Sequence, residues 1–78
     1  MSRLYPWADI VAELRRSPRR WHPSLQDVPI LVARNVRERR APELQLEDGV
    51  IECRTLMVYT TSEGQKRGNI HLRFVPNH

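Results

Sequence analysis

The chain has 78 residues and a formal net charge of +4, and a chain this short buries only about 60% of the surface that its unfolded form exposes. Leu, Ile, Val and Phe supply 20 of the 78 residues, more than the roughly 20% below which disorder is expected. No apolar run approaches the roughly 20 residues that cross a bilayer, so composition predicts one small folded domain over residues 1–78 and excludes a membrane-spanning protein.

The first predicted element is a helix over residues 6–16. Pro6 suits the first helical position, where its missing N–H group costs nothing. Large apolar residues then recur at intervals of three and four, the spacing of one helical face, at Trp7, Ile10, Val11 and Leu14. Ser17 and Pro18 end the helix. Because large aromatic residues on an apolar stripe usually pack, Trp7 is expected to anchor the core.

Residues 17–26 are expected to form an extended connector, because Pro18 and Pro23 both oppose a helix. Two arginines and Trp21 lie between these prolines. One interpretation is an arm whose arginines contact phosphates while Trp21 stacks on a base. The other has Trp21 folded back onto the core, and we favour it because so small a core needs its aromatic residues.

A second helix is predicted over residues 27–40. Val28, Val32 and Val36 are spaced by four residues and therefore share one helical face. Asp27 is expected to cap the first turn, because its side chain can accept a hydrogen bond from a free backbone N–H group. Pro42 ends the helix near residue 40.

The remainder of the chain predicts strands at residues 43–46, 50–60 and 69–75, with a polar loop at residues 62–68. Predicted elements cluster by type instead of alternating, which favours an α+β fold over a parallel α/β sheet. We therefore expect two N-terminal helices packed on a three-stranded antiparallel β-meander.

The middle strand has an irregular apolar pattern. Ile51 and Cys53 share one face of the strand, whereas Leu56 and Val58 share the other. A bulge near Arg54 and Thr55 would restore a single inward face. Without such a bulge, both faces of this strand must be partly covered.

The charge is concentrated in the first half of the sequence. Residues 1–40 carry nine arginines and four acidic residues, a net +5, whereas residues 41–78 have a net charge of −1. Twelve of the thirteen basic residues are Arg, whose planar guanidinium suits phosphate and carboxylate. A nucleic-acid ligand is one explanation of this bias, and a genome rich in G and C is the other.

The pattern resembles a group of small orphan proteins from phages of actinobacteria. The resemblance rests on Trp7, Ile10, Leu14, Pro18 and Trp21, on the Arg-rich segment running into EDGVIECR, and on Leu72, Arg73 and Phe74. It implies no assigned activity and no site residues. It implies instead a bacterial cytoplasm during infection, where small basic proteins act on host DNA, RNA or regulatory proteins.

Cysteine and histidine usage argues against an enzyme or a metal site. The single Cys53 excludes an intramolecular disulfide, and without a secretory leader a reducing cytoplasm is expected. Three histidines and Cys53 lack the spacing of metal ligands, and the glycines form no phosphate-binding loop. We expect a non-enzymatic protein without a cofactor or metal, in which Cys53 is a buried small residue.

Two binding hypotheses follow, and the first is DNA binding. At 100° per residue, Arg34 and Arg37 point away from the valine face of the second helix and Arg40 lies at its margin. These arginines would contact phosphates, while Lys66 and Arg67 at the hairpin tip touch the backbone as a wing does. A standard helix-turn-helix has a turn of three or four residues, and here about ten separate the helices.

The second hypothesis is a protein-binding phage factor that inhibits or redirects a host protein. The contact surface would include the outer face of the last strand, Trp21, and the second face with Val50, Leu56 and Val58. A homodimer is an expected route to extra burial in so small a protein. One continuous basic face would favour nucleic acid, whereas arginines paired with Glu13, Glu38 and Glu43 would favour a salt-bridged scaffold.

Overall fold

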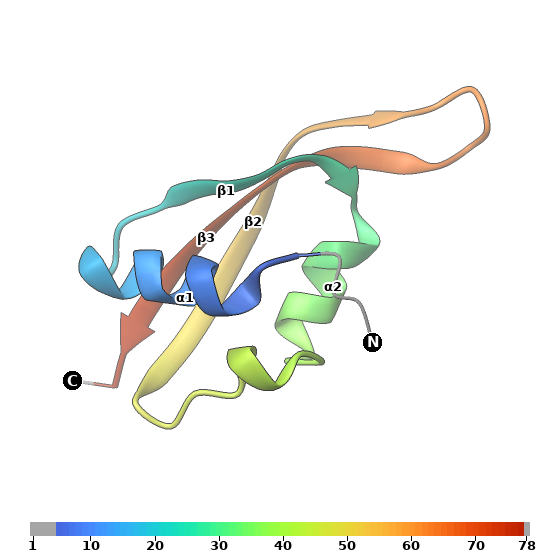
Figure 1. Ribbon diagram of the computed structural model, residues 1–78. Helices are drawn as coiled ribbons and strands as arrows, with labels where there is room; N and C mark the ends of the chain where they lie inside the picture. The colour runs from blue at the N-terminus through green and yellow to red at the C-terminus, as the bar shows by residue number, and fades with distance from the viewer. Residues whose placement is uncertain (1–4, 78) are drawn as a thin grey trace.

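The computed structural model describes residues 5–77 and has an α+β fold with two helices and a three-stranded antiparallel sheet (Figure 1). In chain order the elements are α1 (Trp7–Arg16), β1 (His22–Pro29), α2 (Leu31–Arg37), the short 3-10 helix η1 (Pro42–Leu44), β2 (Gly49–Thr60) and β3 (Lys66–Pro76). The predicted fold class is confirmed. The ends of the predicted domain, residues 1–4 and His78, lie outside the described residues.

The strand order in the sheet is β1-β3-β2, so the last strand lies in the centre. β2 and β3 form a hairpin, and β1 pairs antiparallel with the other edge of β3. The meander predicted from the sequence is therefore wrong in its strand order. The predicted ranges of the last two strands agree with β2 and β3 to within three residues.

The core lies between the helices and one face of the sheet. Ile70, Leu72 and Phe74 of β3 alternate with more exposed residues and are almost fully buried. The helices, β1 and η1 complete this core with Trp7, Val11, Leu14, Leu25, Val28, Val32, Ala33, Val36 and Leu44. Trp7 is 8% exposed, which confirms its predicted role as a core anchor.

A strand, β1, replaces most of the connector predicted at residues 17–26. β1 is an edge strand, and its register with β3 shifts twice, between His22 and Leu25 and between Leu25 and Val28. An irregular edge tolerates proline because some of its N–H groups have no ladder partner. Pro23 is therefore compatible with this strand, although it opposes a helix.

The second helix is shorter than the predicted range 27–40. Asp27 has φ +51° and its backbone N–H donates to the Asn69 side chain, so it belongs to β1 and caps no helix. Arg39, at φ +53°, lies beyond the end of α2. Val28 is buried as predicted, but from a strand and not from the helix.

The segment predicted as a strand at residues 43–46 contains the 3-10 helix η1. Pro42 starts this turn, where its fixed φ angle is favourable. Leu44 is 2% exposed and packs in the core. The alternating residues Leu44 and Leu46 suggested a strand. In the structure Leu44 ends the 3-10 turn and Leu46 follows it.

The predicted bulge occurs later in β2 than expected. Ile51 and Cys53 pair with Phe74 and Leu72 on the core side, and the register shifts only between Leu56 and Tyr59. Beyond this point the hairpin extends away from the helices (Figure 1), in a molecule that measures 43 × 29 × 18 Å. The projecting part of β2 exposes a run of apolar residues, namely Leu56, Met57, Val58 and Tyr59.

Candidate nucleic-acid interface

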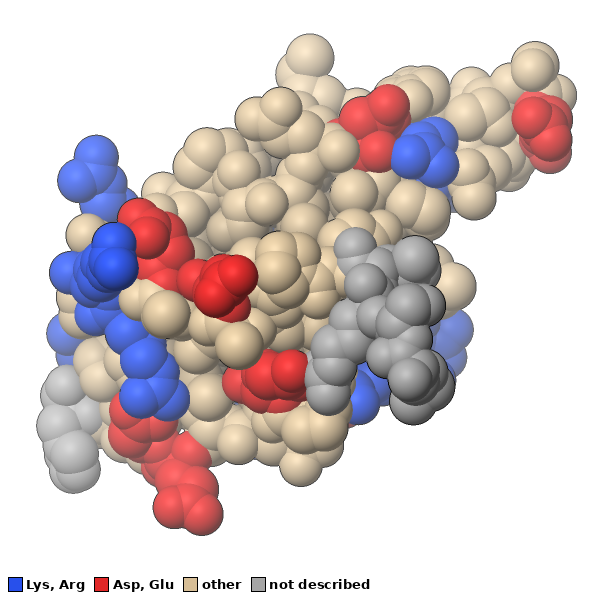
Figure 2. Space-filling model, in the orientation of Figure 1, with Lys and Arg blue, Asp and Glu red and all other residues tan. Residues whose placement is uncertain are grey.

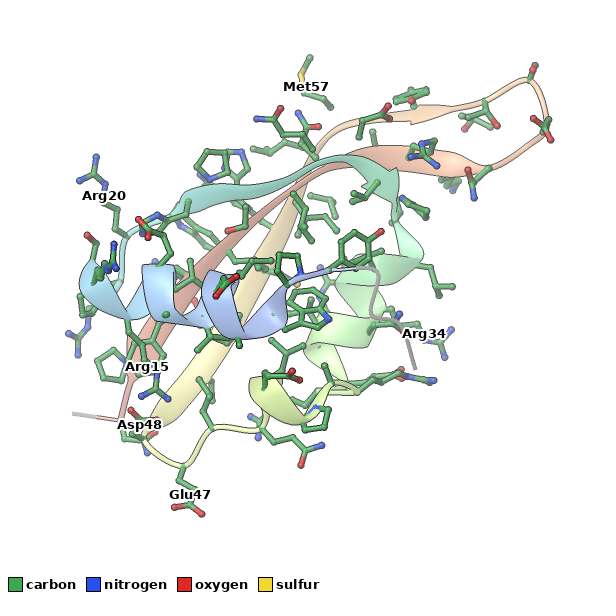
Figure 3. The ribbon with its side chains drawn as sticks, viewed as in Figure 1. Arg15, Arg20, Arg34, Glu47, Asp48 and Met57 are labelled. Carbon is green, nitrogen blue, oxygen red and sulfur yellow. The ribbon has the colours of Figure 1, made fainter. Side chains whose placement is uncertain are left out.

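Many arginines in the described part of the chain are held by carboxylates. The ion pairs join Arg15 to Asp48, Arg16 to Glu13, Arg34 and Arg40 to Glu38, Arg67 to Asp27, and Arg73 to Glu52. Figure 2 views the molecule from the α1 side, and basic and acidic side chains are interspersed there. Figure 3 shows Arg15 beside Asp48, below the end of α1. This side of the molecule resembles a salt-bridged scaffold.

Three of the five residues predicted to bind nucleic acid belong to such pairs. Arg34 and Arg40 both contact Glu38, at 2.9 and 2.6 Å, and their hydrogen bonds lower the pKa of the Glu38 carboxyl. Arg67 contacts the Asp27 carboxylate at 3.2 Å. A phosphate would have to compete with these carboxylates for the three guanidinium groups.

The structure brings the other two predicted residues, Arg37 and Lys66, to one surface depression. We call it the hairpin hollow; it lies between α2 and the hairpin and is lined by Pro29, Ile30, Leu31, Arg34, Arg37, Gln65 and Lys66. The hollow therefore joins the second helix to the loop end of the hairpin, where Lys66 pairs with Thr60. The geometry therefore allows Arg37 of α2 and Lys66 of the hairpin to contact one ligand together, as expected from the sequence.

A second depression, the sheet-edge hollow, has a volume of about 480 Å³ and lies across the edge strand β2. It is lined by Trp21, Arg37, Arg39, Ile51, Glu52, Cys53 and Arg54. Partial burial raises the pKa of the Cys53 thiol, and the Arg37 guanidinium beside it acts in the opposite direction. The Cys53 thiol donates a 3.6 Å hydrogen bond to the Ala33 carbonyl. Cys53 is thus a packed thiol that is half-buried, whereas the sequence predicted a buried residue.

Four cations line these two hollows without contacting any carboxylate of residues 5–77. They are Arg37, Arg39, Arg54 and Lys66, and we call them the cationic strip. Arg37 lines both hollows, so the strip is continuous from the hairpin to the sheet edge. Unlike the paired arginines, these groups can bind an anion without breaking an internal ion pair.

Trp21 lies on the open face of the sheet and not in the core, so the favoured prediction for this residue is wrong. The guanidinium carbons of Arg54 and Arg73 lie 4.5 and 4.6 Å from the centroid of its ring. Trp21 directly precedes β1, and its neighbour His22 pairs with Leu72 on the core side. Alternation along the strand therefore directs Trp21 to the opposite face.

Sequence reasoning did not select Arg39, Arg54 or Arg73 for the candidate site. Arg39 lies outside the helix because of its positive φ, and no helical projection predicts its direction. Arg54 and Arg73 alternate with core residues in their strands. That alternation was a usable signal, because it places both arginines on the face opposite Cys53 and Leu72.

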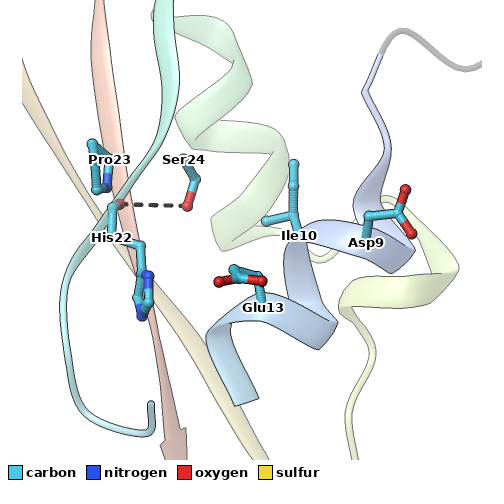
Figure 4. Close-up of a pocket in the computed structure, with 6 residues that line it drawn as sticks. All are labelled: Asp9, Ile10, Glu13, His22, Pro23 and Ser24. Carbon is cyan, nitrogen blue, oxygen red and sulfur yellow. Dashed lines mark hydrogen bonds between the residues drawn. The ribbon is translucent and has the colours of Figure 1, made fainter. Parts of the chain in front are cut away.

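A third hollow lies between α1 and β1, on the side that carries the helices (Figure 4). It is lined by Asp9, Ile10, Glu13, His22, Pro23 and Ser24. Two carboxylates give it the wrong charge for a polyanion. Within residues 5–77 no group of three or more His, Cys, Asp or Glu side chains is arranged to hold a metal ion.

The fold and this surface define a small α+β protein with one helix-covered face and a basic, Trp-containing sheet edge. Comparisons with protein-family models, curated proteins and solved structures find no match. Within the described range, neither helix is long and apolar enough to span a membrane.

Proposed function

We propose that the protein binds nucleic acid through phosphate contacts made by the cationic strip. The observation that carries this proposal is a difference among the basic side chains of residues 5–77 in whether they contact a carboxylate. Six arginines have carboxylate partners, whereas Arg37, Arg39, Arg54 and Lys66 have none among the described residues and share two adjoining hollows. This proposal keeps Arg37 and Lys66 of the predicted site and replaces the other three residues.

The proposed contact differs from a helix-turn-helix. β1 lies between the two helices, and α2 has only seven residues. Arg34 and Arg40, which would flank Arg37 on a recognition helix, are both bound to Glu38. Phosphate contacts along a surface strip need no helix in a groove, because the phosphate backbone alone supplies much of the affinity of such proteins.

The proposal is tested by fluorescence anisotropy with labelled single-stranded and duplex oligonucleotides. Four phosphate contacts predict that affinity falls about 50- to 150-fold when salt rises from about 50 to about 200 mM. The double variant Arg37→Ala/Arg39→Ala should lower the log–log salt slope by about 1.4 to 1.8, because two contacts are lost.

The matched control is the double variant Arg16→Ala/Arg40→Ala, which removes the same charge from arginines that have carboxylate partners. It should leave the salt slope within experimental error of the unmodified protein. An equal loss of affinity in the two double variants would show that net charge alone drives binding. Absence of binding at low salt would rule out the proposed function.

The projecting hairpin favours a second candidate function, binding of a protein partner. Met57 is 79% exposed and Val58 is 50% exposed on an edge strand, and Figure 3 shows Met57 pointing away from the molecule. Contiguous exposed apolar residues are typical of interaction sites. If the phage resemblance holds, the partner is a host protein, and a photo-crosslinking side chain at position 57 should capture it while one at position 20 does not.

A further inference from the structure

One face of the sheet is covered by the helices, and the opposite face carries charged and aromatic groups. On that open face the register places Glu52 opposite Arg73 and Arg54 opposite His71. Trp21 adds its ring beside the two arginines. Open sheet faces that combine aromatic and basic side chains are a common platform for unpaired bases.

The two arginines that contact Trp21 are held differently. Arg73 donates to the Glu52 carboxylate at 2.6 Å and its side chain is 33% exposed, so its position is fixed by an ion pair. Arg54 is an exposed residue that contacts no carboxylate of the described chain. A cation–π contact at an exposed site is weak. The Arg54 guanidinium is therefore the group that can leave the ring.

Trp21 also lines the sheet-edge hollow, together with three members of the cationic strip, Arg37, Arg39 and Arg54. An aromatic ring and phosphate-binding groups thus share one depression. In a duplex the bases are stacked on each other, so no base face is free to meet the ring. In a single strand the phosphates can follow the arginines while a base turns toward Trp21.

We propose that the ligand is a single-stranded nucleic acid and that Trp21 stacks one unpaired base. The base takes the place of the Arg54 guanidinium, which moves from the ring to a phosphate. Arg73 stays on Glu52 and supports the ring. This inference rests on the proposed function of the cationic strip and names its ligand class.

The test uses the intrinsic fluorescence of the full chain, titrated at low salt with oligo(dT), oligo(U) and a DNA duplex of equal length. The chain contains two tryptophans, and Trp7 is buried in the core. Single strands should quench the emission of Trp21, whereas the duplex should not. The deoxyribose and ribose oligonucleotides show whether the 2′-hydroxyl contributes.

Trp21→Ala should lower single-strand affinity about 5- to 150-fold, because one stacked base is lost, and should leave duplex affinity unchanged. Trp21→Phe keeps a flat ring and should retain most of the affinity while the quenching disappears. The Phe variant also checks that loss of binding by the Ala variant does not reflect misfolding.

The outcomes separate this inference from the proposed function. Binding of single strands and duplex with equal affinity, insensitive to Trp21→Ala, would overturn the stacking proposal and leave the cationic strip intact. An equal loss of affinity for single strands and for duplex in Trp21→Ala would also overturn it, since Trp21 would then only support the arginines. Absence of binding by either ligand at low salt would overturn the proposed function itself.

Discussion

Asp27 has an unusual set of contacts for an exposed carboxylate. Its backbone adopts φ +51°, and its side chain accepts a 2.5 Å hydrogen bond from the Tyr59 hydroxyl and a 3.2 Å hydrogen bond from Arg67 Nε. The bond from Tyr59, followed by that from Arg67, lowers the pKa of the Asp27 carboxyl below its ordinary value of 3.8. The same bond to Asp27 raises the pKa of the Tyr59 hydroxyl above 10.0. These contacts join β1 to the loop half of the hairpin, where Tyr59 pairs with Arg67.

Replacing Tyr59 by Phe removes the largest of these interactions. The pKa of Asp27 should then rise toward its ordinary value, as measured by NMR titration of its side-chain carbonyl carbon. Because the pKa is lower in the folded than in the unfolded state, the carboxylate stabilises the fold above the unfolded pKa. That stability is lost as the pH falls through the folded pKa. Tyr59→Phe should therefore lose less stability on acidification than the unmodified protein.

Tyr5→Phe serves as the control, because Tyr5 packs against Trp7 and the core, whereas the side-chain partners of Asp27 are Tyr59 and Arg67. It should leave the Asp27 titration unchanged. An unchanged Asp27 pKa in Tyr59→Phe would mean that the hydrogen bond does not persist in solution.

At the scale of elements, Glu38 limits what α2 can bind. This residue follows the last turn of the helix, where its backbone N–H donates to the Arg34 carbonyl, and its carboxylate holds Arg34 and Arg40. Both arginines lie near Arg37 in sequence. Glu38 therefore keeps two cations from joining the cationic strip.

Glu38→Gln should tighten nucleic-acid binding, because it removes the carboxylate and frees both arginines. The log–log salt slope should steepen by up to about 1.4 for a single strand if each arginine gains a phosphate. Anisotropy titrations at several salt concentrations measure this slope. The control, Glu13→Gln, frees Arg16 on α1 and should not steepen the slope. An equal change of the salt slope in Glu38→Gln and Glu13→Gln would contradict an interface localised at the cationic strip.

Elements with a strong local pattern could be predicted from the sequence. α1 combines a favourable Pro6 with apolar residues on one face, and β3 alternates strictly at Ile70, Leu72 and Phe74. Both predictions agree with the structure to within a few residues. In each case local preference and tertiary packing favour the same conformation.

β1 and the start of α2 could not be predicted in this way. β1 contains Pro23 and Pro29, its register with β3 shifts twice, and its pairing partners lie 38 to 50 residues later in the chain. The valine spacing that suggested a helix from Asp27 is shared between a strand residue, Val28, and α2. Long-range pairing overrode the local pattern.

The candidate site was only partly predictable for a related reason. Helical projection identified Arg37, but whether an arginine is free depends on where the carboxylates lie after folding. Arg67 is paired with Asp27, forty residues away in sequence. Such pairings follow from the strand register, and this register was not available from local patterns.

At the scale of the whole molecule, stability depends on one thin core built on β3. Leu72 is fully buried in the central strand. Leu72→Ala should reduce the free energy of unfolding by about 2–5 kcal/mol, the usual cost of such a cavity. The total free energy of unfolding of a domain of this size is roughly 4–12 kcal/mol. Urea unfolding followed by circular dichroism measures the difference.

Met57→Ala provides the contrast, because Met57 is 79% exposed. It should change the free energy of unfolding by no more than about 0.5 kcal/mol. A small loss in Leu72→Ala, similar to that of Met57→Ala, would show that the core around β3 is loosely packed in solution.

The central position of β3 also bears on how the chain folds while it is being made. A ribosome releases α1, β1, α2 and β2 before the strand that pairs with β1 and β2. Proteins emerge N-terminus first, and here the early segments have no sheet to join. We therefore expect the nascent chain to expose its apolar residues, including those of α1, until β3 leaves the exit tunnel. Folding then occurs in one late step, and the time before it is when chaperones or proteases have access to the chain.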